Sequence, residues 1–212
     1  MKRIDELERE YVLDVLDGQF KTSQGAVYMT KFENAFSDKF KSKFSISHVN
    51  GTATMHSALE ASGVGYGDEV IVPPLTMSAT SLAVLHANAT PIFADIDIDT
   101  FVIDVKSIEE KITKKTKAII TVALYGLSPD MDPIMDIAKK YNLIVIEDNA
   151  EAFLSYYKGR LVGTLGHAAS FSFQSSKHLT AGEGGIITTN DEQLAIRIRK
   201  ASGLGYKNIG AK

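Results

Sequence analysis

Three segments of the sequence place polar side chains directly after an apolar run, where they could do chemistry. Asn50-Gly51-Thr52-Ala53 follows the run 44–49, and a glycine turn that opens a helix offers amides and a hydroxyl to a phosphate group. Glu147-Asp148-Asn149-Ala150-Glu151 follows the run 143–146, and carboxylates at the end of a buried strand are costly unless a cation or a hydrogen-bond donor meets them. The third segment is a polar loop that carries Lys177 and continues into a glycine-rich turn.

Each segment also has an ordinary structural interpretation. Gly51-Thr52 can simply begin a helix, Asp148 can cap one, and Lys177 can be a surface lysine. In this order, however, the segments supply what pyridoxal phosphate requires: amides and hydroxyls for its phosphate, a carboxylate for its ring nitrogen and an amine for its aldehyde. The combination predicts a pyridoxal-phosphate site.

Apolar periodicity indicates the elements that must position these segments. The helical patterns include the stripe Phe32, Phe36, Phe40 and the ranges 53–62, 78–88, 132–140 and 191–200. Short β-branched or alternating runs predict strands over 44–49, 70–72, 92–94, 117–123, 143–147, 169–173 and 186–189. Strands that alternate with helices over short links predict an α/β fold, a three-layer sandwich with a mainly parallel sheet. Functional groups in such a sheet gather at the carboxyl ends of the strands.

Composition narrows the class of protein. The chain has 212 residues, of which 44% are hydrophobic, with 23 basic and 26 acidic side chains and a formal charge of -3. This is typical of a globular protein and excludes collagen-like and low-complexity chains, while the weak negative charge argues against nucleic acid as a partner. Cysteine is absent, and neither a signal peptide nor an apolar run of membrane-spanning length is present. We therefore expect a cytoplasmic protein that does not bind a membrane.

Several other kinds of site are not supported. The sequence contains no P-loop pattern and no Gly-x-Ser-x-Gly nucleophile turn, and Gly63-Val64-Gly65 precedes a strand instead of following one. Asp95, Asp97 and Asp99 resemble the start of a calcium loop, but the required glycine and glutamate are missing. The five histidines show no zinc-ligand spacing, so no metal is expected.

The motifs named above resemble those of the DegT-type sugar aminotransferases, which are pyridoxal-phosphate enzymes of aspartate-aminotransferase fold type I. The likeness runs along the whole chain and includes these segments: Asn-Gly-Thr-Ala at 50–53, Gly-Asp-Glu-Val-Ile-Val-Pro at 67–73, Pro-Ile-Phe-Ala-Asp-Ile-Asp at 91–97, Glu-Asp-Asn-Ala-Glu at 147–151, Ser-Phe-Gln-Ser-Ser-Lys at 172–177 and Gly-Glu-Gly-Gly at 182–185. The Glu-Asp-x-Ala-Glu variant is most similar to the perosamine-synthase and amino-octulosonate branch. The resemblance implies a nucleotide-linked keto-sugar substrate, an amino-acid donor and a homodimer.

Roles for single residues follow from the resemblance by position. Lys177 is expected to form the Schiff base and Asp148 to bind the pyridine nitrogen. Gly51, Thr52, Ala53 and Ser172 are expected to hold the phosphate. Glu151 and Met77 occupy positions where relatives place, respectively, Gln or His near the ring hydroxyl and an aromatic residue against the ring. A methionine thioether can also cover an aromatic face.

Length is the main departure from the family. Members are close to twice as long, and their second half forms a small domain, so residues 1–212 are expected to form the pyridoxal-phosphate-binding large domain alone. Three functions remain open at this point. They are an aminotransferase represented by part of its chain, a catalytically silent cofactor-binding remnant or interaction module, and a deoxysugar dehydratase. Lys177 argues against the last, because the family's dehydratases have histidine at this position.

Overall fold

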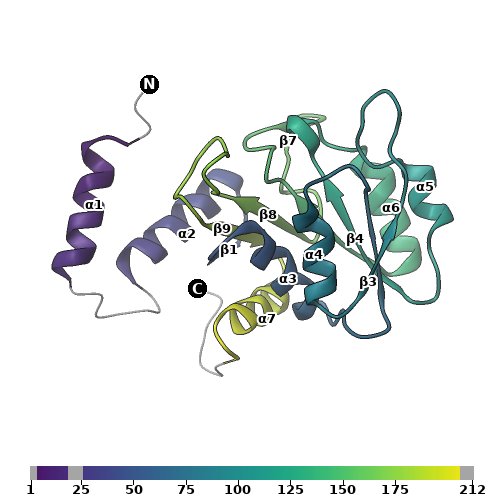
Figure 1. Cartoon of the computed structure of the whole chain (residues 1–212), viewed down its shortest axis with the longest axis horizontal. Coiled ribbons are helices and arrows are strands. Elements are labelled where there is room, and N and C mark those ends of the chain that lie inside the picture. The colour runs from purple at the N-terminus through teal and green to yellow at the C-terminus, as the bar shows by residue number, and fades with distance from the viewer. Residues whose placement is uncertain (1–3, 19–25, 206–212) are drawn as a thin grey trace.

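The structure is a computed structural model that describes residues 4–18 and 26–205 (Figure 1). The predicted domain over 1–212 therefore includes residues 1–3, 19–25 and 206–212, which lie outside the described ranges. Helices and strands alternate along most of the chain, as the apolar periodicity predicts. In chain order they are α1 (Glu6–Asp17), α2 (Val27–Phe40), β1 (Phe44–His48), α3 (Gly51–Ala61), β2 (Glu69–Val72), α4 (Ser78–His86), β3 (Thr90–Phe93), α5 (Val105–Glu110), β4 (Thr116–Val122), the 3-10 helix η1 (Leu124–Gly126), α6 (Met131–Tyr141), β5 (Ile144–Asp148), β6 (Tyr156–Tyr157), β7 (Arg160–Leu161), β8 (Ala168–Ser172), β9 (Gly185–Thr189) and α7 (Glu192–Ser202).

A seven-stranded sheet forms the centre of the molecule, in the order β1-β9-β8-β5-β4-β2-β3. Neighbouring strands are parallel except where β9 is involved, since β9 runs antiparallel to both β1 and β8. The predicted α/β class with a mainly parallel sheet is thus confirmed. The strands β1, β8, β5 and β4 end at the same edge of the sheet, because parallel strands share their direction.

Helices cover both faces of this sheet. On one face α3, α4 and α7 bury an apolar cluster that includes Leu59, Val84 and Ile198 against Ile146 and Ile187. On the other face α5 and α6 bury a second cluster against β2, β4 and β5. Alternate strand residues belong to alternate clusters, as a pleated sheet buried on both sides requires.

Helix α2 brings a third, aromatic cluster to the face that α6 covers. Phe36 and Phe40 are buried with Phe171, and the Phe40 and Phe171 rings have centroids 4.7 Å apart. Phe32, the first member of the predicted stripe, stays 37% exposed but packs edge-to-face on Phe173 at 5.4 Å. The stripe therefore joins α2 to the strand that precedes the loop of Lys177.

The structure also contains elements that the apolar periodicity does not predict. Helix α1 has no buried residue and lies at one end of the molecule beside α2 (Figure 1), where Tyr28 Oη donates to Asp14 at 2.6 Å. The six-residue helix α5 and the two-residue strands of the β6–β7 hairpin are too short to show a period. No helix within the described ranges is long and apolar enough to cross a membrane.

Candidate active site

A cavity of about 430 Å³ opens where β1, β4, β5 and β8 end. Its lining brings together seven residues that the sequence analysis assigns to the cofactor, namely Gly51, Thr52, Met77, Asp148, Glu151, Ser172 and Lys177. The eighth, Ala53, is not among the lining residues. Residues from the first quarter and the last quarter of the chain meet here because β9 pairs with both β1 and β8.

The N-terminal end of α3 forms one wall of the cavity. Asn50 is the N-cap, and its side-chain oxygen accepts a hydrogen bond from the Ala53 amide at 2.8 Å. Ala53 therefore uses its amide within the cap, whereas Gly51 and Thr52 contribute first-turn amides that have no acceptor inside the helix. The positive end of the helix dipole also favours an anion at this position.

Glycine allows α3 to begin in direct contact with the sheet. A Cβ atom added to Gly51 would lie 2.9 Å from Ser172 Cβ, closer than real Cβ contacts. A Cβ on Gly185 of β9 would lie 2.5 Å from the Asn50 carbonyl. These two glycines let the start of α3 lie against Ser172 and β9, and both Thr52 and Ser172 line the cavity.

Asp148 lies at the floor of the cavity, at the end of β5. Its side chain is 5% exposed, and its oxygens accept hydrogen bonds from Thr80 Oγ1 at 2.8 Å and from the Ala150 amide at 3.2 Å. Burial raises the pKa of the Asp148 carboxyl above its ordinary value, while these two hydrogen bonds and the charge of Lys177 act in the opposite direction. A carboxylate accepts about four hydrogen bonds, so Asp148 can accept from a further donor inside the cavity.

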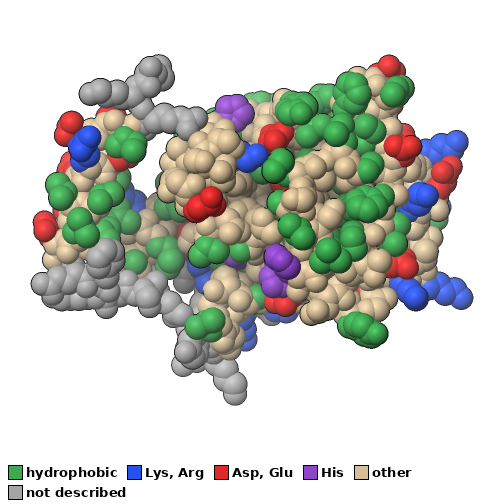
Figure 2. Space-filling view, in the orientation of Figure 1, with side chains coloured by type: hydrophobic (Ala, Val, Ile, Leu, Met, Phe, Trp, Pro, Cys, Tyr) green, Lys and Arg blue, Asp and Glu red, His purple; other side chains and the backbone are tan. Residues whose placement is uncertain are grey.

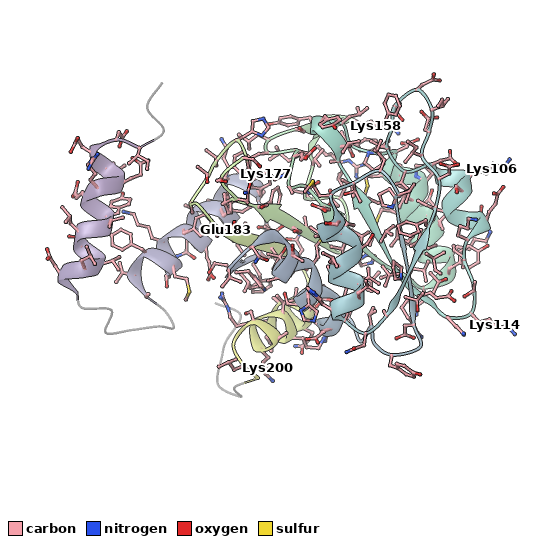
Figure 3. The ribbon with its side chains drawn as sticks, in the orientation of Figure 1. Lys106, Lys114, Lys158, Lys177, Glu183 and Lys200 are labelled. Atoms are coloured by element: carbon pink, nitrogen blue, oxygen red, sulfur yellow. The ribbon has the colours of Figure 1, made fainter. Side chains whose placement is uncertain are left out.

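Lys177 reaches the cavity from the loop after β8. Its Nζ lies 3.4 Å from Glu151 Oε1, and both side chains are partly buried. Glu151 also accepts a hydrogen bond from the Tyr125 amide at 3.2 Å through its other oxygen. In Figure 3, Lys177 and Glu183 lie on the same loop, which connects the end of β8 to the start of β9. A second cavity of about 340 Å³ adjoins the first and shares Ala150, Glu151, Ser176 and Lys177 with it.

Thr80 is a site residue that sequence reasoning missed. It is completely buried on the first turn of α4 and contacts Asp148 from a segment far away in the sequence. A signal was present, because Thr80, Ala83, Val84 and Ala87 have the spacing of a buried helix stripe, and a threonine in such a stripe requires a polar partner. Nothing in the sequence indicates that this partner is Asp148.

Comparison with known proteins identifies the family. The model of the DegT/DnrJ/EryC1/StrS aminotransferase family matches residues 2–212. The chain is a member of this family. It is 47% identical over 203 residues to the GDP-perosamine synthase of Caulobacter vibrioides, covering 96% of this chain and 54% of that protein. It is 48% identical over 198 residues to the GDP-perosamine synthase of Escherichia coli O157:H7, covering 93% and 54%.

Solved structures of the family have the same fold. An aminotransferase from Psychrobacter cryohalolentis superposes with a TM-score of 0.86 at 43% identity, over 92% of this chain and 50% of that one. This chain therefore spans about half the length of the family members it matches. The family assignment and the fold predicted from the sequence are both confirmed.

The residues of the cavity fit the cofactor of this family of aminotransferases. Pyridoxal phosphate carries a phosphate, a basic ring nitrogen and an aldehyde, and the cavity offers a helix N-terminus, a buried carboxylate and a lysine amine. Because Gly51 and Gly185 have no Cβ, α3 begins close to the sheet, and Gly51 and Thr52 of its first turn line the cavity. The donor and acceptor set is thus complementary to the three polar ends of this one molecule.

Proposed function

We propose that this chain is the pyridoxal-phosphate-binding large domain of a sugar aminotransferase. The reaction transfers an amino group from glutamate or glutamine to a nucleotide-linked keto-sugar. One observation carries the proposal: Lys177, Asp148 and the N-terminus of α3 line a single cavity of about 430 Å³. The similarity to two GDP-perosamine synthases supports a GDP-linked sugar as the substrate.

Each group has a role in binding the cofactor. The amides of Gly51 and Thr52, with the Thr52 and Ser172 hydroxyls, hold the phosphate at the start of α3. Asp148 accepts a hydrogen bond from the ring nitrogen and keeps that nitrogen protonated. Met77 covers a ring face, and Glu151 lies beside the amine of Lys177.

The bound cofactor supplies an electron sink for the α-carbon of the amino donor. Lys177 Nζ provides the amine that binds the cofactor. When it is not bonded to the cofactor, the same Nζ would act as the base that accepts the α-proton of the amino donor and would then give that proton back. Glu151, whose Oε1 lies 3.4 Å from this amine, orients it. The smaller cavity lined by Tyr125, His178 and Lys177 provides the adjoining space for the sugar.

The test is the near-visible absorption band of lysine-bound pyridoxal phosphate. We expect the band to form in this chain, to disappear in Lys177→Ala and to persist in Lys114→Ala, which changes an exposed lysine far from Lys177 (Figure 3). Borohydride reduction followed by peptide mapping should place the label on Lys177. An unchanged band in Lys177→Ala would refute the assignment.

A half-reaction separates an aminotransferase from a silent remnant or interaction module. Glutamate should discharge the absorption band of the loaded chain in a single turnover, with one equivalent of 2-oxoglutarate formed. A band that forms but does not respond to glutamate or glutamine would favour the remnant. Release of water from a deoxysugar without incorporation of an amine would favour the dehydratase.

We also propose that the protein is a homodimer, and that α4 contributes to the interface. Leu82 and Leu85 on α4 are 42% and 52% exposed, and Leu75 and Met77 just before the helix are 43% and 65% exposed. Figure 2 shows hydrophobic side chains over the part of the surface where Figure 1 places α4. An exposed apolar patch of this kind, at the rim of a site, is typical of a protein interface.

A further inference from the structure

We propose that Thr80 is a positioning residue for Asp148, and that Thr76 orients it, so that the three side chains form a hydroxyl relay ending at the carboxylate. The inference rests on the proposed function, in which Asp148 binds the ring nitrogen of the cofactor. It assigns a role to α4, a helix that carries none of the groups that bind the phosphate or the aldehyde.

The contact between Thr80 and Asp148 is direct and protected from water. Thr80 Oγ1 donates to Asp148 Oδ2 at 2.8 Å, and the two side chains are 0% and 5% exposed. Hydrogen bonds to ionised groups are stronger than neutral ones, and a site of low dielectric constant strengthens them further. Thr80 is therefore placed to fix the orientation of the carboxylate.

The relay has a direction. A threonine hydroxyl has a single hydrogen, which Thr80 gives to Asp148. The Thr76 hydroxyl lies 2.9 Å from Thr80 Oγ1, so it must be the donor to that oxygen. Thr76 lines the cavity while Thr80 lies behind its wall, and the relay therefore connects the cavity surface to the buried acid.

The relay leaves Asp148 able to bind a further group. Thr80 donates to Oδ2 and the Ala150 amide donates to Oδ1, so each oxygen retains a lone pair. The charged groups that act on Asp148 are Lys177, which lowers its pKa, and Glu151, which raises it. Among the groups that lower the pKa of this buried carboxyl, Thr80 contributes most.

The same turn also carries Met77, the residue assigned to the ring face. The Thr80 amide donates to the Met77 carbonyl at 3.2 Å, and α4 begins at the residue after Met77. Holding Thr80 against Asp148 therefore fixes the start of the helix as well. The group assigned to the ring nitrogen and the group assigned to the ring face are positioned together.

The experiment compares Thr80→Val, which keeps the shape and removes the hydroxyl, with Thr80→Ser, which keeps the hydroxyl. In the chain without cofactor, carboxyl-carbon NMR follows the titration of Asp148, with Asp148→Asn used to assign its signal. Thr80→Val should raise the pKa of Asp148 by about one unit or more, and Thr80→Ser should leave it near the wild-type value. In the loaded chain, the glutamate half-reaction should slow roughly 10-fold or more in Thr80→Val and recover in Thr80→Ser.

Thr76→Val provides a second test in case Thr80→Val does not fold. It removes only the donor to Thr80, and it should shift the Asp148 titration in the same direction by less. An unchanged titration in Thr80→Val, or equal effects of valine and serine at position 80, would overturn the relay. A shifted titration in a chain that never forms the cofactor band would support the relay and refute the proposed function.

Discussion

Asp148 and Glu147 show two ways in which one strand end holds buried carboxylates. Glu147 points into the protein and accepts hydrogen bonds from the amides of Gly163, Leu165 and Gly166 at 2.6–2.7 Å, so its acceptors are used within the fold. Asp148 points into the cavity and accepts one hydroxyl and one amide. Burial raises the pKa of both carboxyls. Asp148 accepts fewer hydrogen bonds than Glu147. Its remaining lone pairs are available to a ligand, but a buried carboxylate with free lone pairs also lowers the stability of the fold.

This difference predicts a pH-dependent effect on stability. The pKa of Asp148 is raised in the folded chain, so its contribution to stability is fully present below the unfolded value, about 3.9, and is lost as the pH rises through the folded value. Asp148→Asn should remove the decrease in stability that ionisation of Asp148 causes as the pH rises. The cofactor-free variant should gain stability relative to wild type as the pH rises above about 4, by about 1.4 kcal/mol for each unit by which folding raises the pKa.

Calorimetric Tm values between pH 4 and pH 8 at constant ionic strength measure this effect. Asp136→Asn is the matched control, because Asp136 is exposed on α6 and the change removes the same charge from solvent. Its Tm difference from wild type should stay flat over this range. A flat difference for Asp148→Asn as well would contradict the prediction.

At the scale of elements, the close approach of β9 to the start of α3 builds the proposed phosphate site. Gly185→Ala would place a methyl group 2.5 Å from the Asn50 carbonyl and 2.8 Å from the Gly51 nitrogen, so the strand and the helix must separate. We expect the free energy of unfolding to fall by about 1–3 kcal/mol and pyridoxal phosphate to bind more weakly. Urea unfolding and a cofactor titration measure the two effects.

The neighbouring glycine provides the control. A Cβ at Gly184 would meet Phe173 Cβ at 3.5 Å, which is an ordinary van der Waals contact. Gly184→Ala should therefore change the unfolding free energy by no more than about 0.5 kcal/mol and leave cofactor binding intact. Equal effects at the two positions would show that the contact with α3 is not the cause.

Local pattern predicts the elements that bury a regular face. The strands β4 and β5 are found within one residue of their predicted bounds, because their near-continuous apolar runs match a sheet buried on both faces. Apolar periodicity does not predict α1, because none of the residues of this helix is buried. It does not predict α5 either, because this helix has only six residues. The three segments of the site could be read from the sequence because each follows a strand.

The features of the site that the sequence does not predict arise from contacts between side chains and backbone groups of different segments. The sequence offers the Ala53 amide to a phosphate, but the Asn50 side chain takes it as a helix cap. The partner of Asp148 comes from α4, and only the packing of α4 against the sheet places Thr80 there. Such contacts depend on how two elements meet, and no spacing within either element contains that information.

At the scale of the whole molecule, the exposed face of α4 predicts self-association. The double variant Leu82→Glu, Leu85→Glu should turn a dimer into a monomer in sedimentation velocity while changing the Tm of the cofactor-free monomer little, because both side chains are already about half exposed. Ile98→Glu, at a loop residue that is 79% exposed, should leave the dimer intact. A wild-type chain that remains monomeric at high micromolar concentration would contradict the proposal.

The position of β9 has a consequence for synthesis on the ribosome. Within the described residues, strand β1 lies at the edge of the sheet and pairs only with β9, with Phe44 opposite Thr189. A nascent chain emerges from its N-terminus, so β1 cannot pair with β9 until the segment that contains β9 has also been synthesised. The proposed phosphate site is therefore completed only after β9 has docked, and until then β1 remains an unpaired strand that is open to chaperones and to other growing chains.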